Sequence, residues 1–232
     1  MRQIVLDTET TGLQTEEGHR IIEIGCIELV NRKFTGKRLH HYINPQREID
    51  AGALEVHGIT QAFLQSKPLF AEISMELLDF IQDAELIIHN APFDLGFMHY
   101  ELSLLDRNWK PLTDRCRIVD TLQLARQLHV GQRNSLDALC KRYGVDNTQR
   151  ELHGALLDAH LLAQVYLAMT GGQGSLFGDL QETDVTSKEA TAQSANSLKK
   201  RNLIILKATE SELVDHQEHL KKMSEKGKCV WF

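Results

Sequence analysis

Residues 4–12 have the sequence IVLDTETTG, and this stretch decides the fold. Three consecutive apolar residues, Ile4 to Leu6, predict a strand buried on both faces, and two carboxylates follow where the apolar run ends. Because side chains alternate along a strand, Asp7 and Glu9 point to the same side. Two acids held side by side repel each other unless a positive charge lies between them. A divalent metal ion is the simplest such charge, although an acidic strand end can also be merely solvated.

The composition is that of an ordinary soluble globular protein, since 42% of the 232 residues are hydrophobic and 25% are charged. No segment approaches the ~20 apolar residues of a membrane span. The first strand begins at once and leaves no room for a signal peptide, so we expect a cytoplasmic protein. The four cysteines are scattered without a C-x-x-C pair, which argues against a zinc site or a disulfide framework.

The net charge limits how the chain can bind nucleic acid. It has 32 acidic residues against 26 lysines and arginines, which gives a formal net charge of −6. Sequence-independent affinity for DNA comes mainly from lysine and arginine side chains that neutralise phosphates. If the substrate is a nucleic acid, bound metal ions or a partner protein must therefore supply much of the attraction.

The hydrophobic pattern predicts an α/β domain over residues 1–170. Strands come first, then a strand–helix unit, and then further helices. After the first strand we expect strands at Arg20–Val30, Phe34–Ile43 and Glu85–His89, and helical regions at Asp50–Gln65, Phe70–Ile81, Pro92 to about Leu105, 118–129, 135–143 and Gly154–Met169.

The composition changes after the α/β domain. Residues 171–199 are rich in Gly, Ser, Thr, Gln, Glu and Ala and are typical of a flexible linker. Residues 200–232 then predict a strand (LIIL), a helix over Glu210–Met223 and a second strand (CVWF). Because some 30 residues make a small core, we expect this C-terminal segment to order fully only against a partner.

Asp94 is the third candidate ligand. The predicted strand Glu85–His89 leads into a helix whose first position suits Pro92, which puts Asp94 in the first turn. The helix dipole alone favours an acid there, but the preceding strand can end beside the end of the first strand. We expect the apolar stripe of this helix to consist of Phe93, Phe97, Tyr100 and Leu104.

Asp158 is the fourth candidate. On the helix Gly154–Met169 it shares a face with Leu161, Leu162 and Val165, whereas His160 and Gln164 project roughly opposite. A carboxylate on an apolar face is costly unless it is paired or bound to a metal ion. Chance placement at the mouth of the core is the alternative.

His153 precedes Asp158 by five residues. Residues five apart on one helix are ~140° apart, so the two share a site only if His153 lies on the entering loop. We expect Gly154 to let the chain bend there. Other histidines are poorer ligands, because His40 and His41 face opposite sides of a strand and the pair His216 and His219 suits a solvated helix face.

Three motifs in this order, DTETTG at 7–12, HNAPFDLGF at 89–97 and HGALLDA at 153–159, resemble the DEDDh superfamily of 3′→5′ exonucleases. Within it, VHGI at 56–59, RNSLDALCKRYGVDN at 133–147 and LHGALLDAHLLAQVYLAMTGGQ at 152–173 are similar to the proofreading epsilon subunits of bacterial DNA polymerase III. The resemblance covers the chain nearly end to end. It implies a ribonuclease-H-like fold, with a central mixed sheet flanked by helices.

The resemblance also implies two divalent metal ions held by residues that match Asp7, Glu9, Asp94 and Asp158. Two ions about 4 Å apart stabilise the attacking and leaving oxygens of phosphodiester hydrolysis and lower the pKa of a bound water. Oxygen ligands suit Mg²⁺ or Mn²⁺ rather than zinc. His153, with an intrinsic pKa of ~6.5, is the expected general base.

The same resemblance assigns substrate contacts. Thr10, Thr11 and His57 match positions that line the terminal-nucleotide pocket, together with the metal ligands Asp7, Glu9 and Asp158. Gly52 stands where some relatives carry an acidic residue near the 3′ end, so that contact is left open. The expected substrate is a single-stranded 3′ end, which a mispaired terminus reaches at a smaller unpairing cost, and the product is a 5′-mononucleotide.

The resemblance also implies protein partners, most of them for the residues after 170. Gln173, Leu176 and Phe177 in the segment 173–177 resemble the Q-x-x-L-F peptides that dock on the bacterial sliding clamp. We expect residues 200–232 to bind the polymerase catalytic (alpha) subunit, and the exonuclease domain is a candidate to bind the small theta subunit.

Three functions are compatible with the sequence. The leading hypothesis is a metal-dependent 3′→5′ exodeoxyribonuclease that proofreads DNA replication. An exoribonuclease that trims RNA 3′ ends would share the five motif residues but has no use for the linker and C-terminal segment. A non-catalytic tether between polymerase and clamp would use that segment but has no reason to hold four carboxylates together.

Overall fold

The computed structural model describes residues 1–105, 111–150, 152–171 and 209–226. The chain divides into two compact units, Met1–Gln181 and Glu182–Phe232. The predicted clamp peptide 173–177 and the two predicted C-terminal strands lie outside the described residues, so these remain predictions. No helix in the described ranges is long and apolar enough to cross a membrane.

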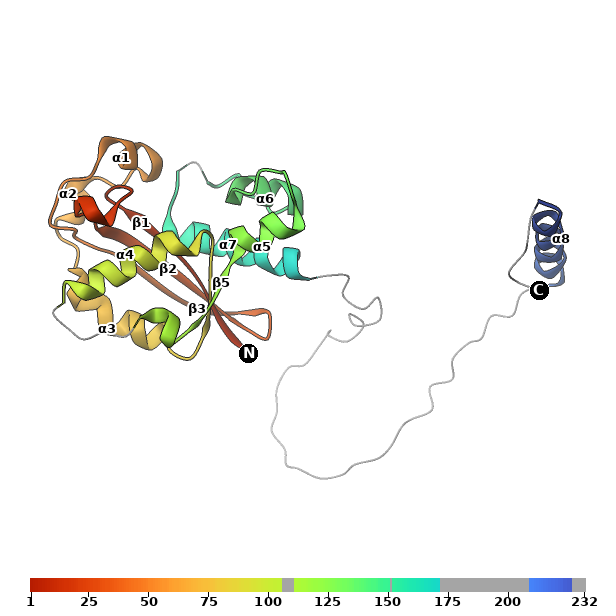
Figure 1. The fold of residues 1–232 in the computed structure, drawn as a ribbon, viewed down its shortest axis with the longest axis horizontal. Coiled ribbons are helices and arrows are strands. Elements are labelled where there is room, and N and C mark those ends of the chain that lie inside the picture. The colour runs from red at the N-terminus through yellow and green to blue at the C-terminus, as the bar shows by residue number, and fades with distance from the viewer. Residues whose placement is uncertain (106–110, 151, 172–208, 227–232) are drawn as a thin grey trace, which may run out of the picture. The chain divides into compact units, whose positions relative to one another are not determined.

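The first unit is built on a five-stranded mixed sheet with the strand order β3-β2-β1-β4-β5 (Figure 1). Strand β1 pairs antiparallel with β2 and parallel with β4, β2 pairs antiparallel with β3, and β4 pairs parallel with β5. The carboxyl ends of β1, β4 and β5 therefore meet at one edge of the sheet. The strands are β1 (Arg2–Thr10), β2 (Ile21–Val30), β3 (Lys33–Tyr42), β4 (Glu85–Ile88) and β5 (Arg117–Asp120).

Helices cover both faces of this sheet, as the sequence predicts. Side chains of α3 and α4 pack with Ile4 and Leu6 on one face, and side chains of α5, α6 and α7 pack with Val5 on the other. Because successive side chains of β1 point to opposite faces of the sheet, the core is divided into two halves. The helices described in this unit are α1 (Ala51–His57), α2 (Gln61–Leu64), α3 (Phe70–Ile81), α4 (Ala91–Ser103), α5 (Thr121–Leu128), α6 (Leu136–Tyr143) and α7 (Ala155–Thr170), with the 3-10 turns η1 (Thr15–Glu17) and η2 (Leu112–Asp114).

The prediction of one helical stretch over 118–129 is wrong in its first part. Residues Arg117–Asp120 form the edge strand β5, and the helix α5 begins only at Thr121. Asp120 marks the boundary, because its Oδ1 accepts hydrogen bonds from the backbone N–H groups of Leu122 and Gln123. A four-residue strand that runs directly into an N-cap has too few residues for its periodicity to be told from that of the helix.

The predicted apolar stripe of α4 is also wrong. Phe97 is buried, but Leu104 is 48% exposed, and the buried face includes the charged residue Glu101. Glu101 forms a two-point ion pair with Arg20, at 2.6 and 2.8 Å, and accepts a hydrogen bond from the backbone N–H of Ile21. Phe93 and Phe97 do pack into the core, but a polar group buried with its partners does not show in a hydrophobic pattern, so the predicted stripe omits Glu101.

In the second unit the described residues contain α8 (Glu210–Lys226). This helix confirms the predicted start at Glu210 and extends past the predicted end at Met223. The His216 side chain is exposed, in keeping with a solvated helix face.

Candidate active site

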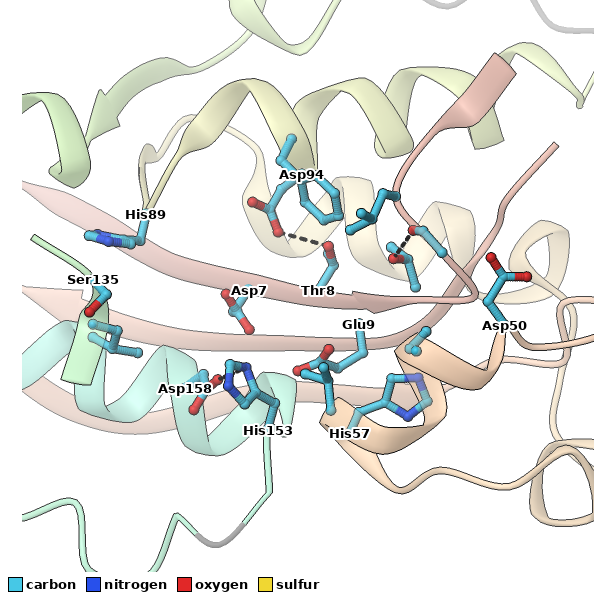
Figure 2. Close-up of a pocket in the computed structure, with 18 of the residues that line it drawn as sticks. Asp7, Thr8, Glu9, Asp50, His57, His89, Asp94, Ser135, His153 and Asp158 are labelled. Atoms are coloured by element: carbon cyan, nitrogen blue, oxygen red, sulfur yellow. Dashed lines mark hydrogen bonds and ion pairs between the residues drawn. The ribbon is translucent and has the colours of Figure 1, made fainter. Parts of the chain in front are cut away.

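A cavity of about 710 Å³ opens at the edge where β1, β4 and β5 end (Figure 2). The residues that line it come from both faces of the sheet and from the loops around its edge. All five predicted catalytic residues are among them, namely Asp7, Glu9, Asp94, His153 and Asp158.

Strand β1 supplies the first two acids and continues through them to Thr10, so the acids lie within the strand and not just after it. Asp7 and Glu9 share the face of Val5, which packs with α7. Thr8 has the opposite orientation and meets α4. Its Oγ1 donates a hydrogen bond of 2.7 Å to Oδ1 of Asp94, which is drawn in Figure 2. Asp94 therefore reaches the cavity from the other face of the sheet.

Helix α7 brings Asp158 to the cavity from the face of Asp7 and Glu9. Asp158 is 2% exposed and lies on the buried side of α7 with Leu161 and Leu162, as predicted. The helix lies very close to β2, because a Cβ built on Gly25 would be 2.3 Å from the backbone nitrogen of Leu156. Since Gly25 is the ladder partner of Asp7, the glycine permits close approach beside that acid.

Glu23 holds the first turn of α7, a role that the sequence did not reveal. Its Oε2 accepts a hydrogen bond of 3.1 Å from the backbone N–H of Ala155, and its Oε1 lies 2.7 Å from Nε2 of His40. Glu23 is 2% exposed and is the ladder partner of Glu9. A buried carboxylate at a helix N-terminus is stabilised by the free N–H groups there. The position of Asp158 thus depends on a strand residue next to the site.

His153 lies on the loop that enters α7, as predicted. Its backbone N–H donates to the carbonyl of Val56 at 3.1 Å, and its Nδ1 lies 3.5 Å from Oδ2 of Asp158. Gly154 has φ −159° and ψ 124°, an extended conformation that any residue adopts. The proposed need for a glycine at the bend is therefore wrong, because the loop changes direction without a left-handed residue at that position.

The structure brings three of the five residues into one compact group. One ligand atom from each of Glu9, His153 and Asp158 lies within 4.8 Å of the other two. Asp7 and Asp94 line the same cavity without belonging to this group. The carboxylate of Asp94 is instead engaged by Thr8.

Burial, with smaller contributions from neighbouring carboxylates, raises the pKa of three acids in the cavity. Burial, followed by the charges of Asp158 and Glu23, raises the pKa of Glu9 to about 8. Burial raises the pKa of Asp94 to about 7 against the opposing hydrogen bond from Thr8. Burial and the charge of Asp94 also hold the pKa of Asp7 well above its usual range. Acids held this way favour a nearby cation.

The donor set fits a divalent metal ion. Most of its donors are carboxylate oxygens, the ligands that hard divalent cations prefer, whereas the imidazole nitrogen of His153 is a softer ligand. The cavity also excludes bulk water from part of the cluster, since Asp94 and Asp158 are almost fully buried. Charge, chemistry and burial all match an ion at this place.

Arg150 is a residue of the site that sequence reasoning missed. Its guanidinium binds both oxygens of Asp158, from Nε at 2.5 Å and from Nη2 at 2.6 Å. Nη1 contacts Oδ1 of Asp137 at 2.6 Å, and Nη2 lies 3.1 Å from Nδ1 of His153. The only signal in the sequence is a cation three residues before His153.

Of the three residues predicted to line the nucleotide pocket, two line the cavity and one does not. Thr10 and His57 line the cavity, whereas Thr11 is buried behind it and bonds to His19. His57 Nδ1 accepts a hydrogen bond from the backbone N–H of Ile59, which makes Nε2 a donor. That Nε2 is buried and forms no well-aligned hydrogen bond among the described residues, although the Thr10 backbone lies close enough to raise the pKa of His57 against the larger, lowering effect of burial. Gly52 also lines the cavity, and a Cβ there would meet no atom within 4 Å.

Comparison with known proteins gives relatives over almost the whole chain. A family described as exonuclease, of the RNase T type, matches residues 4–166. The DNA polymerase III subunit epsilon of Haemophilus influenzae is 51% identical over 99% of this chain and 94% of its own length. The subunit epsilon of Escherichia coli is 50% identical over 99% of this chain and 97% of its own length.

Solved structures share the fold. Exonuclease X in complex with 5′ overhanging duplex DNA superimposes with a TM-score of 0.57 and 27% identity, over 74% of this chain and 93% of its own. The nuclease domain of 3′hExo, a DEDDh family member bound to rAMP, superimposes with a TM-score of 0.62 and 17% identity, over 72% of this chain and 90% of its own. At 17% identity, the similarity to 3′hExo supports only a shared fold.

Proposed function

The chain belongs to the exonuclease family, among the DNA polymerase III epsilon subunits, and from this premise we propose how its residues remove a nucleotide from the 3′ end of DNA. The chain is a 3′→5′ proofreading exonuclease that acts on DNA in association with DNA polymerase III. The observation that carries the proposed mechanism is the convergence of Glu9, His153 and Asp158 in one cavity.

The exonuclease family depends on metal ions, and acidic residues that suit them line this cavity. We propose that Asp7, Glu9, Asp94 and Asp158 hold two divalent ions, Mg²⁺ or Mn²⁺. Once bound, such ions stabilise charge on the scissile phosphate and lower the pKa of the attacking water. The raised pKa values of Glu9 and Asp94 support this assignment, because burial disfavours their ionised forms and a bound cation stabilises those forms.

His153 is the proposed general base. Burial, then the nearby charge of Arg150, lowers its pKa from 6.5, so the imidazole is mostly neutral at pH 7 and can accept a proton from water. The hydrogen bond from its backbone to Val56 fixes the loop, and Asp158 lies beside the ring. His153 is also 45% exposed in its side chain, which leaves a path for the proton to reach solvent.

The terminal nucleotide is proposed to bind between β1 and α1. Leu13, Val56 and Phe93 give the cavity apolar surface for a base, and Thr10 lines it beside them. The Nε2–H of His57, which lacks a well-formed hydrogen bond and lies near the Thr10 backbone, is a donor for a sugar or phosphate oxygen. None of these groups reads a base edge specifically, so selection falls to the ease with which a mispaired 3′ end separates from its template. The product is a 5′-mononucleotide.

Further assignments concern the rest of the chain. We propose that residues 1–170 form the catalytic domain and that residues 171–199 link it to a segment, 200–232, that binds the catalytic (alpha) subunit. Within the linker, Gln173, Leu176 and Phe177 are proposed to contact the sliding clamp. Binding of a theta subunit to the exonuclease domain and a cytoplasmic location are also proposals, supported by the family alone.

The direct test is hydrolysis of a 3′-labelled single-stranded DNA oligonucleotide with Mn²⁺ or Mg²⁺, with an RNA oligonucleotide of the same sequence alongside. We expect Asp7→Asn to abolish DNA hydrolysis. Asp83→Asn is the matched control, because Asp83 is exposed, remote from the cavity and at φ 57°, a conformation that asparagine accepts. Full activity of Asp7→Asn would contradict the proposed site, and faster turnover of RNA would favour the exoribonuclease.

A further inference from the structure

A single strong cation faces the acids of the cavity. Of the described residues that line it, seven are aspartate or glutamate and Arg150 is the only lysine or arginine. Its side chain is 6% exposed, so the charge is shielded from solvent. A guanidinium in this environment is held by its partners, since an unpaired buried charge is very costly.

Arg150 occupies the carboxylate that a metal ion would need. The planar guanidinium binds Asp158 through two parallel hydrogen bonds of 2.5 and 2.6 Å, which engages both carboxylate oxygens. Nη2 also lies 3.1 Å from Nδ1 of His153. Arg150 thus touches two of the three residues whose ligand atoms converge within 4.8 Å.

A second anion, Asp137, gives the guanidinium an alternative partner. Nη1 binds Oδ1 of Asp137 at 2.6 Å, and the Asp137 side chain is 58% exposed where it lines the cavity. This contact uses a different nitrogen from the two that hold Asp158. Arg150 can therefore release Asp158 and keep Asp137, which leaves two N–H groups facing the cavity.

We propose that Arg150 exchanges Asp158 for a phosphate of the DNA strand when a divalent ion binds. In the metal-free protein the guanidinium neutralises and orients Asp158. A divalent ion competes for the same oxygens and repels the guanidinium, which then turns about Asp137 and binds the substrate backbone. This inference rests on the proposed function, because it needs an ion at Asp158 and a nucleic acid in the cavity.

The exchange explains how an acidic cavity accepts a polyanion. Lysine and arginine provide most of the attraction for nucleic acid backbones, and few are placed to do so here. Guanidinium binds phosphate in the same bidentate manner as carboxylate, so the two anions are interchangeable partners. Arg150 would act as a substrate-binding residue only in the metal-loaded protein.

The experiment compares the full chain with Arg150→Gln by calorimetric titration with Mn²⁺ in the absence of DNA. We expect the variant to bind Mn²⁺ about tenfold more tightly, the change that follows from losing a competing charge-assisted pair. A purely structural role for Arg150 predicts the reverse, because Asp158 would lose its support. Equal or weaker Mn²⁺ binding by Arg150→Gln overturns the exchange.

The second readout is KM for single-stranded DNA at saturating Mn²⁺. We expect KM of Arg150→Gln to rise at least fivefold, and the dependence of DNA binding on salt to become shallower by about one phosphate contact. Unchanged KM and salt dependence overturn the phosphate contact. Arg150→Lys, which keeps the charge but not the two-point geometry, should fall between the two proteins and serves if the glutamine variant does not fold.

Two controls separate this inference from the proposed function. Arg142→Gln removes a nearby arginine that contacts Asn134 and the Arg133 carbonyl instead of the acids, and should leave Mn²⁺ affinity unchanged. Asp158→Asn should weaken Mn²⁺ binding. If Asp158→Asn binds Mn²⁺ as tightly as the unmodified chain, the metal site itself is misassigned. If only the Arg150 variants behave against expectation, the metal site stands and the exchange fails.

Discussion

Gly25 lies so close to Leu156 that any side chain at Gly25 would overlap the first turn of α7, since a Cβ there would be 2.3 Å from the Leu156 nitrogen. Gly25 pairs with Asp7 across the β1–β2 ladder, and Leu156 is two residues before Asp158. The absence of a side chain at Gly25 therefore lets α7 pack close to the sheet, which sets the distance between Asp7 and Asp158.

Gly25→Ala should push α7 away from β2. The overlap is with backbone atoms that have no freedom to rotate, so we expect a loss of about 1–3 kcal/mol in the free energy of unfolding. Displacement of His153 and Asp158 should also lower kcat by at least tenfold. Chemical denaturation and single-stranded DNA hydrolysis measure the two effects.

Gly96→Ala is the matched control for that substitution. Gly96 lies inside α4, and a Cβ there would meet no atom within 4 Å. Alanine in a helix interior should stabilise the protein by about 0.5–1 kcal/mol and leave activity unchanged. Equal behaviour of the two alanine variants would refute the role given to Gly25.

Glu23→Gln tests the support beneath α7. The amide keeps one acceptor oxygen for the N–H of Ala155 but replaces the negative charge, and its NH2 can no longer accept a hydrogen bond from His40. We expect a stability loss of about 1–2 kcal/mol and a lower kcat with little change in KM. The exposed pair of Glu76 and His41 is chemically similar and remote, so Glu76→Gln should change neither quantity. A kcat equal to that of the unmodified chain would show that Glu23 is dispensable for the site.

Much of the fold follows from local patterns. The strand β1 is visible as a continuous apolar run, and the helix α3 and the placement of Asp158 on the buried face of α7 follow from helical spacing. The family motifs named the five candidate catalytic residues, which line one cavity.

The missed features depend on contacts that the local pattern does not specify. Glu23 is an ordinary charged residue until β2 and α7 come together, and Arg150 until the loop before α7 folds it onto Asp158 and Asp137. Glu101, which forms a buried ion pair with Arg20, is likewise part of the buried face of α4 that the predicted stripe omits. Hydrophobic periodicity reports which side is buried only where the buried partners are apolar.

The metal-free protein should lose stability as the pH rises. The folded-state pKa of Glu9 is raised from 4.5 to about 8, so the folded protein binds this proton more tightly than the unfolded chain. The stabilisation is complete below pH 4.5 and is lost as the pH rises towards 8, by up to about 1.4 kcal/mol per pH unit for one group. Chemical denaturation in EDTA at pH 5, 6, 7 and 8 measures this decline in the free energy of unfolding.

Two comparisons make this pH dependence specific to the site. Glu9→Gln removes the titrating group and should flatten the decline, although Asp94, with its pKa near 7, keeps part of it. Saturating Mn²⁺ should also restore stability at pH 8, since a bound cation favours the ionised acids. A decline of the same slope in Glu9→Gln would place the responsible groups elsewhere.

The clamp peptide gives an independent prediction for residues outside the described part of the chain. Changing Leu176 and Phe177 together to Ala should weaken binding to the sliding clamp, because a short linker peptide has little else to bury. Hydrolysis of single-stranded DNA should stay the same, since the residues proposed to carry the chemistry are Asp7, Glu9, Asp94, His153 and Asp158. Unchanged clamp affinity in a pull-down would exclude this peptide as the contact.

The central claim is that four carboxylates from β1, α4 and α7 hold two divalent ions beside His153. Anomalous diffraction from a crystal of the protein soaked in Mn²⁺ tests it most directly. We predict two anomalous peaks about 4 Å apart in the cavity, with oxygens of Asp7, Glu9, Asp94 and Asp158 as ligands. A cavity without manganese, or manganese bound away from these acids, would contradict the claim.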